Sequence, residues 1–127
     1  MLQRPSTCRG CPLDALGTGF MVPDGAGAAN VLLVGEALGE REAEEGKPFV
    51  GPAGKILGDC MTRAGLQRDD FWIANALWCR PPNNKIEAPY ATPALKHCWD
   101  AHLLPTITRL KPKVIVPLGN TALHQFT

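Results

Sequence analysis

Three short runs of mostly apolar residues divide the chain, at 30–34, 71–77 and 114–118. A strand that is buried on both faces is apolar throughout, so these runs predict the strands of a parallel sheet. The second run contains one polar residue, Asn75. A buried asparagine needs a hydrogen-bonding partner or a function, and Asn75 is therefore a candidate functional residue.

Between these runs, apolar residues recur at helical spacing. One such pattern covers 52–64, and a second covers 92–110, where Pro105 is expected to bend the helix. A last helix is expected to start at Thr121 and to be cut off at Thr127. Alternating strands and helices predict an α/β fold in three layers, α/β/α, with a central parallel sheet and right-handed crossovers.

The remaining segments are rich in glycine and proline. Residues 1–29 are expected to form an irregular arm, and 30–127 the α/β core of a single domain that spans 1–127. The segment 36–54 is expected to be a long loop at the C-terminal end of the first strand. Ligands of open parallel sheets bind beyond the C-terminal strand ends, so a ligand site is expected at this edge.

Composition narrows the class of protein. With 127 residues and 45% hydrophobic residues, the chain is long enough for one domain with a modest core. The formal net charge of +1 gives no argument for nucleic acid or membrane binding. No apolar run is long enough to span a membrane, and the N-terminus lacks the apolar core of a signal peptide. A cytoplasmic location is therefore expected.

Five cysteines in a chain without an export signal favour metal binding over a disulfide framework. Cys8 and Cys11 form a C-x2-C pair, and Cys79 and Cys98 form a second, wider pair. Such thiolate sets hold either zinc or an iron–sulfur cluster, and the spacing does not separate the two. The alternative is a set of unrelated buried free cysteines. Cys60 is expected to pack on the apolar face of its helix.

Three longer segments carry a family resemblance. They read GEALGEREAEEGKPFVGPAGKIL at 35–57, NALWCRPPNNK at 75–85 and LKPKVIVPLGNTAL at 110–123. In this order, and with the early cysteine pair and the later cysteine, they closely resemble family 4 uracil-DNA glycosylases, the iron–sulfur members of that superfamily. The resemblance implies a uracil-DNA glycosylase-like fold. It also implies a [4Fe-4S] cluster on the four paired cysteines.

The implied activity is hydrolysis of the N-glycosidic bond of uracil in DNA, the first step of base excision repair. The implied partner is uracil-containing DNA, single- or double-stranded, bound by a monomer. An enzyme of this kind must take the base out of the stack and read its edge. A side-chain amide can accept from uracil N3–H and donate to O4, whereas cytosine presents the opposite pattern. Asn75 matches the uracil-reading residue of the family; the alternative is an asparagine that caps a turn.

The resemblance assigns three further residues to the base pocket. Phe49 matches the side chain that stacks on the base, and its alternative role is core packing. Glu36 and Glu42 match two pocket carboxylates, which could stabilise a cation-like sugar or position water. The other glutamates of the loop are expected to form a solvated face: Glu40, Glu44 and Glu45.

Phosphate contacts are expected beside this pocket. The turn from Gly51 to Gly54 enters a helix, and its backbone N–H groups could meet a phosphate. Lys55 and Arg80 lie next to the expected site and could contact the DNA backbone, although an ordinary surface role is the default for such residues. The same holds for Lys47 and Lys85. The histidines occupy no recognisable motif and are expected to be structural or exposed: His97, His102 and His124.

Two departures from the family pattern leave alternatives open. Leu38 stands where the family has proline, and the family's later His-Pro motif, whose histidine donates to uracil O2, does not occur in 1–127. The chain is therefore expected to be C-terminally truncated, with an exposed sheet edge. One alternative is a non-catalytic DNA-binding module of the same fold that bears a cluster or zinc. A covalent uracil-binding relative is disfavoured, because the stretch after Cys79 has no histidine for the linkage.

Overall fold

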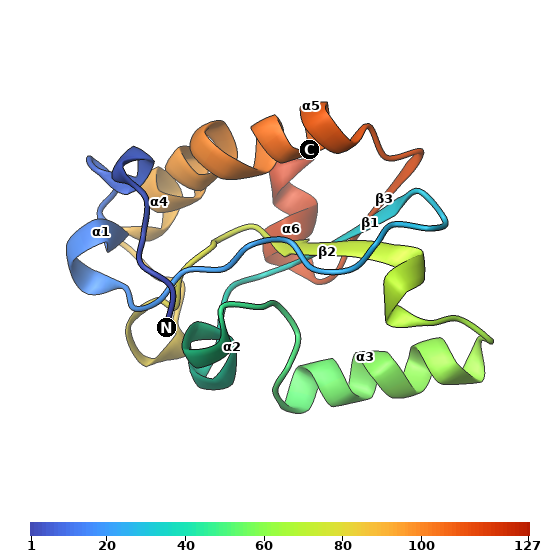
Figure 1. The fold of residues 1–127 in the computed structure, drawn as a ribbon. Helices are drawn as coiled ribbons and strands as arrows, with labels where there is room; N and C mark the ends of the chain where they lie inside the picture. The colour runs from blue at the N-terminus through green and yellow to red at the C-terminus, as the bar shows by residue number, and fades with distance from the viewer.

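A three-stranded parallel sheet forms the centre of the computed structural model, which describes residues 1–127 (Figure 1). Its strands are β1 (Val31–Gly35), β2 (Phe71–Asn75) and β3 (Val114–Pro117), in the order β2-β1-β3. All three apolar runs thus form parallel strands, as predicted. Gly35 at the end of β1 is in register with Asn75 at the end of β2, so the two strands end side by side.

Helices cover both faces of the sheet, which confirms the predicted α/β/α layers. In the view of Figure 1, α3 (Pro52–Arg63) lies below the strands, and α4 (Ala91–Cys98) and α5 (Leu104–Leu110) lie above them. A π-helical turn separates α4 from α5, so the expected bend lies just before Pro105. The last helix, α6, spans Asn120–Gln125.

Alternate residues of β1 serve two separate cores, because successive side chains of a strand point to opposite faces. Leu32 and Val34 pack with Leu103 and Ala122 on the side of α4 to α6. Leu33 packs on the opposite side, against Met61 of α3. Each buried leucine contributes roughly 1.5–3 kcal/mol of hydrophobic stabilisation. Burial on both faces explains why the strand is apolar throughout.

The segment 36–54 is not a continuous loop as predicted, since it contains α2 (Glu40–Glu45). Sequence reasoning placed the glutamates of this segment on a loop. The side chain of Glu42, at the third helical position, instead accepts a hydrogen bond from the backbone N–H of Gly39. This contact satisfies a donor at the helix start and allows a short helix to form. Gly46, in the left-handed region, ends it.

The N-terminal arm is more ordered than predicted. It contains a 3-10 turn at Ser6–Cys8 and a one-turn helix, α1 (Leu13–Leu16), which lies beside α4 in Figure 1. Further along, backbone bridges join Thr18 to Arg80 and Asp24 to Ile73. The arm therefore runs antiparallel to β2 and covers its outer edge. This pairing also carries the early part of the chain toward the residues after β2.

The opposite edge of the sheet is open, as expected. β3 is the last strand in the order, and Val114 at its start is 51% exposed. No helix in the fold is both long and apolar enough to cross a membrane.

Candidate functional site

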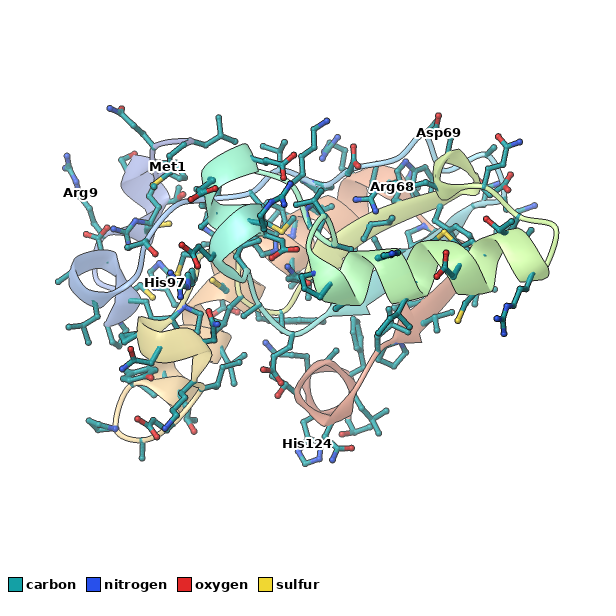
Figure 2. The ribbon with its side chains drawn as sticks, turned by 90° about the horizontal axis from the view of Figure 1, so that it is seen from below. Met1, Arg9, Arg68, Asp69, His97 and His124 are labelled. Atoms are coloured by element: carbon teal, nitrogen blue, oxygen red, sulfur yellow. The ribbon has the colours of Figure 1, made fainter.

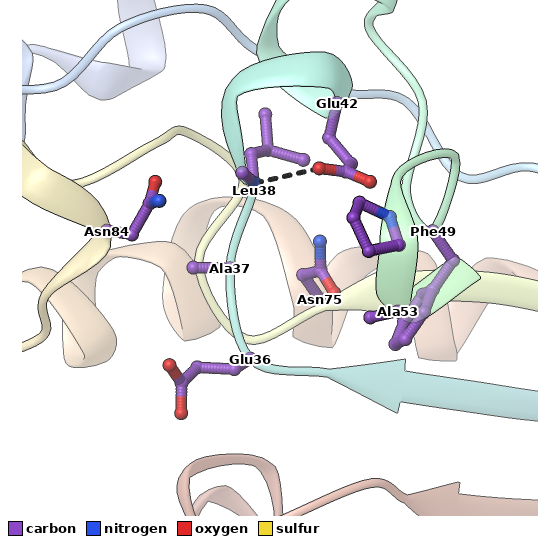
Figure 3. Close-up of a pocket in the computed structure, with 10 residues that line it drawn as sticks. Glu36, Ala37, Leu38, Glu42, Phe49, Ala53, Asn75 and Asn84 are labelled. Atoms are coloured by element: carbon purple, nitrogen blue, oxygen red, sulfur yellow. Dashed lines mark hydrogen bonds between the residues drawn. The ribbon is translucent and has the colours of Figure 1, made fainter. Parts of the chain in front are cut away.

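A pocket of about 270 Å³ opens where β1 and β2 end, between the loop after β1, the loop before α3 and the start of α3 (Figure 3). This is the sheet edge at which sequence reasoning expected a ligand site. The pocket brings together all four residues predicted for the base site, and Leu38 and Asn84 also line it. The four are Glu36, Glu42, Phe49 and Asn75.

Asn75 supplies an unused acceptor to this pocket. Its side chain is only 1% exposed, and its Nδ2 contacts the Sδ of Met21 at 3.6 Å. Its Oδ1 has no hydrogen-bond partner. A buried polar atom without a partner costs about 1–3 kcal/mol, so the fold retains Asn75 here at the expense of stability. A ligand that donates to Oδ1 would remove this cost.

Phe49 lies against Asn75 because Gly35 leaves room for both. A Cβ on Gly35 would come within 2.5 Å of the Phe49 ring and 2.6 Å of Asn75 Oδ1. Glycine at this position therefore lets an aromatic face and a side-chain amide meet at the end of β1. Phe49 itself adopts a left-handed backbone conformation with φ of 52°. This conformation is rare for a bulky residue and needs support from neighbouring groups.

Glu42 provides part of that support. The residue is 9% exposed, and its carboxylate accepts hydrogen bonds from the backbone N–H groups of Gly39 at 3.1 Å, Val50 at 2.9 Å and Gly51 at 2.6 Å. Figure 3 shows this side chain above Asn75, with the bond to Gly39 drawn as a dashed line. The carboxylate thus joins the start of α2 to the loop that carries Phe49. These contacts describe a positioning residue; the predicted catalytic role of Glu42 stays a prediction.

We expect the change Glu42→Ala to lower the free energy of unfolding by about 3 kcal/mol, because it leaves three backbone donors, two of them around the loop before α3, without their acceptor. Chemical denaturation would measure this loss. The exposed neighbour Glu44 makes no side-chain hydrogen bond, so Glu44→Ala is a matched control that should change stability by less than about 0.5 kcal/mol. Equal effects of the two changes would contradict the assigned role.

Glu36 differs from Glu42 in exposure and in partner. It follows β1 directly, is exposed, and its Oε2 accepts a hydrogen bond from the Thr121 hydroxyl of α6 at 2.9 Å. In Figure 3, Glu36 and Phe49 lie on opposite sides of Asn75. A carboxylate therefore stands at the open side of the pocket, with one oxygen held by α6 and the other available.

The residues predicted to contact phosphate have different surroundings. The N–H of Gly51 is already bound to Glu42, and a Cβ on Gly54 would come within 2.1 Å of the Phe49 carbonyl oxygen. Both glycines thus have a local role in shaping the Phe49 loop. Lys55 is exposed in the first turn of α3, and Arg80 donates to Asn84 at 2.7 Å on the rim of the pocket. Their contacts with DNA stay predictions.

The four paired cysteines meet at one place. Cys8, Cys11, Cys79 and Cys98 are buried, free of disulfides, and line the same cavity. The bridge between Thr18 and Arg80 explains how the arm reaches this position. Cys60, in contrast, is exposed on α3, so its predicted packing was wrong. The helix turns Met61 into the core in its place.

The buried cysteine thiols of this cavity would become thiolates only beside a positively charged group, such as a metal centre. Burial, together with neighbouring cysteines, raises the pKa of Cys79 and of Cys98 to about 12. Thiolates would be unfavourable there unless metal ions balanced their charge. The four cysteines line one shared cavity, and a set of four thiols is a donor set that fits an iron–sulfur cluster.

Sequence reasoning missed several residues around the two sites. His102 is buried, stacks on Trp78 and has its Nε2 3.3 Å from the Sγ of Cys8. Burial, with a smaller effect of His97, lowers its pKa, which favours the neutral ring. No local motif indicates such long-range contacts. Arg68 was missed for the same reason, although it is hydrogen-bonded to the loop that carries Phe49.

Comparison with known proteins gives the family. A profile described as the uracil DNA glycosylase superfamily matches residues 22–127. A type-4 uracil-DNA glycosylase of Thermotoga maritima is 40% identical over 98% of this chain and 62% of its own length. A second, of Archaeoglobus fulgidus, is 40% identical over 91% of this chain and 56% of its own length. A third, of Pyrobaculum aerophilum, is 38% identical over 88% of this chain and 55% of its own length.

The chain thus spans little more than half the length of the curated relatives it matches. The part that the profile matches contains the sheet, the pocket at its edge and two of the four paired cysteines, Cys79 and Cys98. Because the superfamily profile covers most of the residues, the chain belongs to the uracil-DNA glycosylase superfamily.

Proposed function

We propose that this protein is a uracil-DNA glycosylase, which hydrolyses the bond between uracil N1 and the sugar C1′ and leaves an abasic site in DNA. The observation that carries the proposal is the buried, unpartnered Oδ1 of Asn75 in a pocket that also holds Phe49 and Glu36. The names of the similar proteins support the same activity.

Recognition of the base follows from the amide and the ring. Oδ1 of Asn75 would accept from uracil N3–H, and Nδ2 would donate to O4 in place of its long contact with sulfur. Phe49 would stack on the base beside this edge. A base must leave the duplex stack to enter this pocket, so the substrate would be single-stranded or flipped-out DNA.

Bond cleavage would use the carboxylate at the open side of the pocket. As the C1′–N1 bond breaks, uracil leaves with the electron pair and the sugar becomes cation-like. The oxygen of water then bonds to C1′ and loses a proton. Glu36 would stabilise the sugar cation or hold this water, whereas Glu42 would position the surrounding loop through its backbone hydrogen bonds.

The four paired cysteines would hold a [4Fe-4S] cluster. The four cysteines line one shared cavity, which supports a cluster held by all four. When bound, the cluster would supply a covalent link between the N-terminal arm and the residues that follow β2. Lys55 and Arg80, beside the pocket, would contact the DNA backbone together with the turn at 51–54. We further propose that the protein acts as a monomer in the cytoplasm, where cysteines stay reduced.

The first test is release of uracil from a single-stranded oligonucleotide that carries one uracil, followed by alkaline cleavage of the abasic site. We expect release by this chain and a fall of about 100-fold in Glu36→Gln, by analogy with other groups that stabilise transition-state charge. The thermal stability of Glu36→Gln should be unchanged, because the side chain is exposed. Glu44→Gln serves as the control and should release uracil at the normal rate.

A non-catalytic DNA-binding module of the same fold is the competing proposal. It predicts selective binding to the uracil-containing strand without release of the base. Release that is equal in the original protein and in Glu36→Gln would reject the role given to Glu36. Absence of both release and selective binding would reject the glycosylase proposal itself.

A further inference from the structure

Arg68 makes a set of contacts that surface arginines do not commonly have. It lies in the 3-10 turn Arg68–Asp70, between α3 and β2, where Figure 2 labels it beside α3. Its Nη1 donates to the carbonyl oxygen of Phe49 at 2.9 Å, and its Nη2 donates to that of Pro48. Its Nε donates to the carboxylate of Asp24 at 2.8 Å. All three guanidinium nitrogens are therefore engaged.

We propose that Arg68 is a positioning residue of the base pocket, which holds Phe49 in the orientation needed for stacking on uracil. This inference rests on the proposed function for the identity of the base. The hold on the loop itself is a property of the chain and can be tested without a substrate.

The loop needs such a hold because of its backbone. Phe49 has a φ of 52°, a left-handed conformation that non-glycine residues adopt only when their surroundings impose it. Glu42 binds the N–H groups of Val50 and Gly51, which follow Phe49. Arg68 donates to the carbonyl oxygens of Pro48 and Phe49. The donors and the acceptors of one short loop are thus fixed by two oppositely charged side chains.

Asp24 fixes Arg68 in turn. Burial raises the pKa of Asp24, but the hydrogen bond from Arg68, a backbone bond from Gly25 and the positive charges of Arg68 and Lys47 outweigh it and lower the pKa. The carboxylate is therefore charged at neutral pH. Asp24 is itself bridged by its backbone to Ile73 of β2. The N-terminal arm thus reaches the base pocket through Asp24 and Arg68.

A simple surface ion pair is the other explanation for Arg68. Such a pair contributes little and acts on no particular loop. The two carbonyl contacts argue against it, because both acceptors belong to the residues that set the direction of the Phe49 ring. Lysine cannot make the same three hydrogen bonds, since its single ammonium lacks the planar fork of donors of a guanidinium group.

The test begins with amide hydrogen exchange of the Phe49 loop in Arg68→Ala, Arg68→Lys and the original chain. The control is Arg63→Ala, since Arg63 is exposed in the last turn of α3 and makes no side-chain hydrogen bond. We expect the Val50 and Gly51 amides to exchange about 10-fold faster in Arg68→Ala than in the original chain. The increase should be smaller in Arg68→Lys, and the rate in Arg63→Ala should be normal. Unchanged exchange in Arg68→Ala would overturn the proposal.

A double-mutant cycle with Phe49 then connects the loop to the base. In the original background, Arg68→Ala should weaken binding to a uracil-containing oligonucleotide by about 10- to 100-fold, as expected for a misplaced contact group. In a Phe49→Ala background the same change should cost less than about 2-fold, because the residue through which Arg68 acts is gone. Equal losses in both backgrounds would show that Arg68 acts on stability or DNA generally, and would reject the proposal.

The two experiments separate the failure of this inference from that of the proposed function. If the original chain does not prefer uracil over thymine in binding, the proposed function fails, and the exchange rates still decide whether Arg68 holds the loop. If the chain prefers uracil and Arg68→Ala binds equally well, the positioning role fails while the proposed function stands.

Discussion

Replacement of Asn75 by alanine is expected to lower the rate of uracil release by about 10²- to 10³-fold, the usual effect of removing one group that stabilises or orients the reacting base. The pocket has no second side-chain amide at the buried end, since Asn84 lies at its exposed rim. The loss should appear in single-turnover release from a single-stranded oligonucleotide.

The thermal stability of Asn75→Ala should remain close to that of the original chain, although its activity is largely lost. Asn75→Ala removes an oxygen that has no partner and a nitrogen whose contact is a long one to sulfur. The melting temperature should therefore change little, apart from the effect of a small cavity. A large fall in melting temperature, in proportion to the loss of activity, would assign Asn75 to folding instead of base recognition.

Asn75→Asp provides a sharper test of the reading mechanism. A carboxylate keeps an acceptor for uracil N3–H and for the cytosine amino group, but it loses the donor for uracil O4. We expect discrimination against cytosine to relax or uracil excision to be lost. Unchanged excision of uracil with unchanged rejection of cytosine would contradict the assignment of Asn75.

The sheet was predictable from the sequence because burial on both faces leaves a direct mark on each strand. The three apolar runs became β1 to β3, and the one polar residue among them became the centre of the pocket. The segment 36–54 was predicted to be a loop, although it contains α2. A glutamate that caps a helix cannot be distinguished by sequence alone from any other acidic residue. The helix α2 depends on the contact of Glu42 with Gly39, and sequence periodicity over so short an element is not informative.

The residues that support the site were not predictable for a different reason. Arg68 reaches Phe49 and Asp24, and His102 reaches Cys8, over distances in sequence that no local motif encodes. The different roles of the two pocket carboxylates, Glu36 and Glu42, were not predictable from the sequence either. Both glutamates occur in one segment, yet only the fold shows that Glu42 is bound to three backbone N–H groups and that Glu36 faces the open side.

Loss of a cluster ligand is expected to have the second large effect. Cys98→Ser should abolish stoichiometric iron and sulfide and the visible absorbance of the cluster, because Cys98 lines the cavity with the other three paired cysteines. Cys60→Ser is the matched control, since that thiol is exposed and lies outside the cavity. Its iron and sulfide content should be normal. Zinc without sulfide in the original chain would replace the cluster by a zinc site, and equal iron in both variants would remove Cys98 from the ligand set.

The same variant should reveal what the cluster does for the fold. Its proposed ligands come from the N-terminal arm and from the residues after β2, so a bound cluster would close a long loop of the chain and remove conformational freedom from the unfolded state. We expect Cys98→Ser to lower the free energy of unfolding by about 3 kcal/mol or more relative to the cluster-loaded protein. After chelation and reduction, the difference in melting temperature between the original chain and Cys98→Ser should become smaller, because neither then holds a cluster and they differ only by a buried hydroxyl in place of a thiol. A difference of the same size before and after the metal is removed would show that Cys98 stabilises the fold by packing alone.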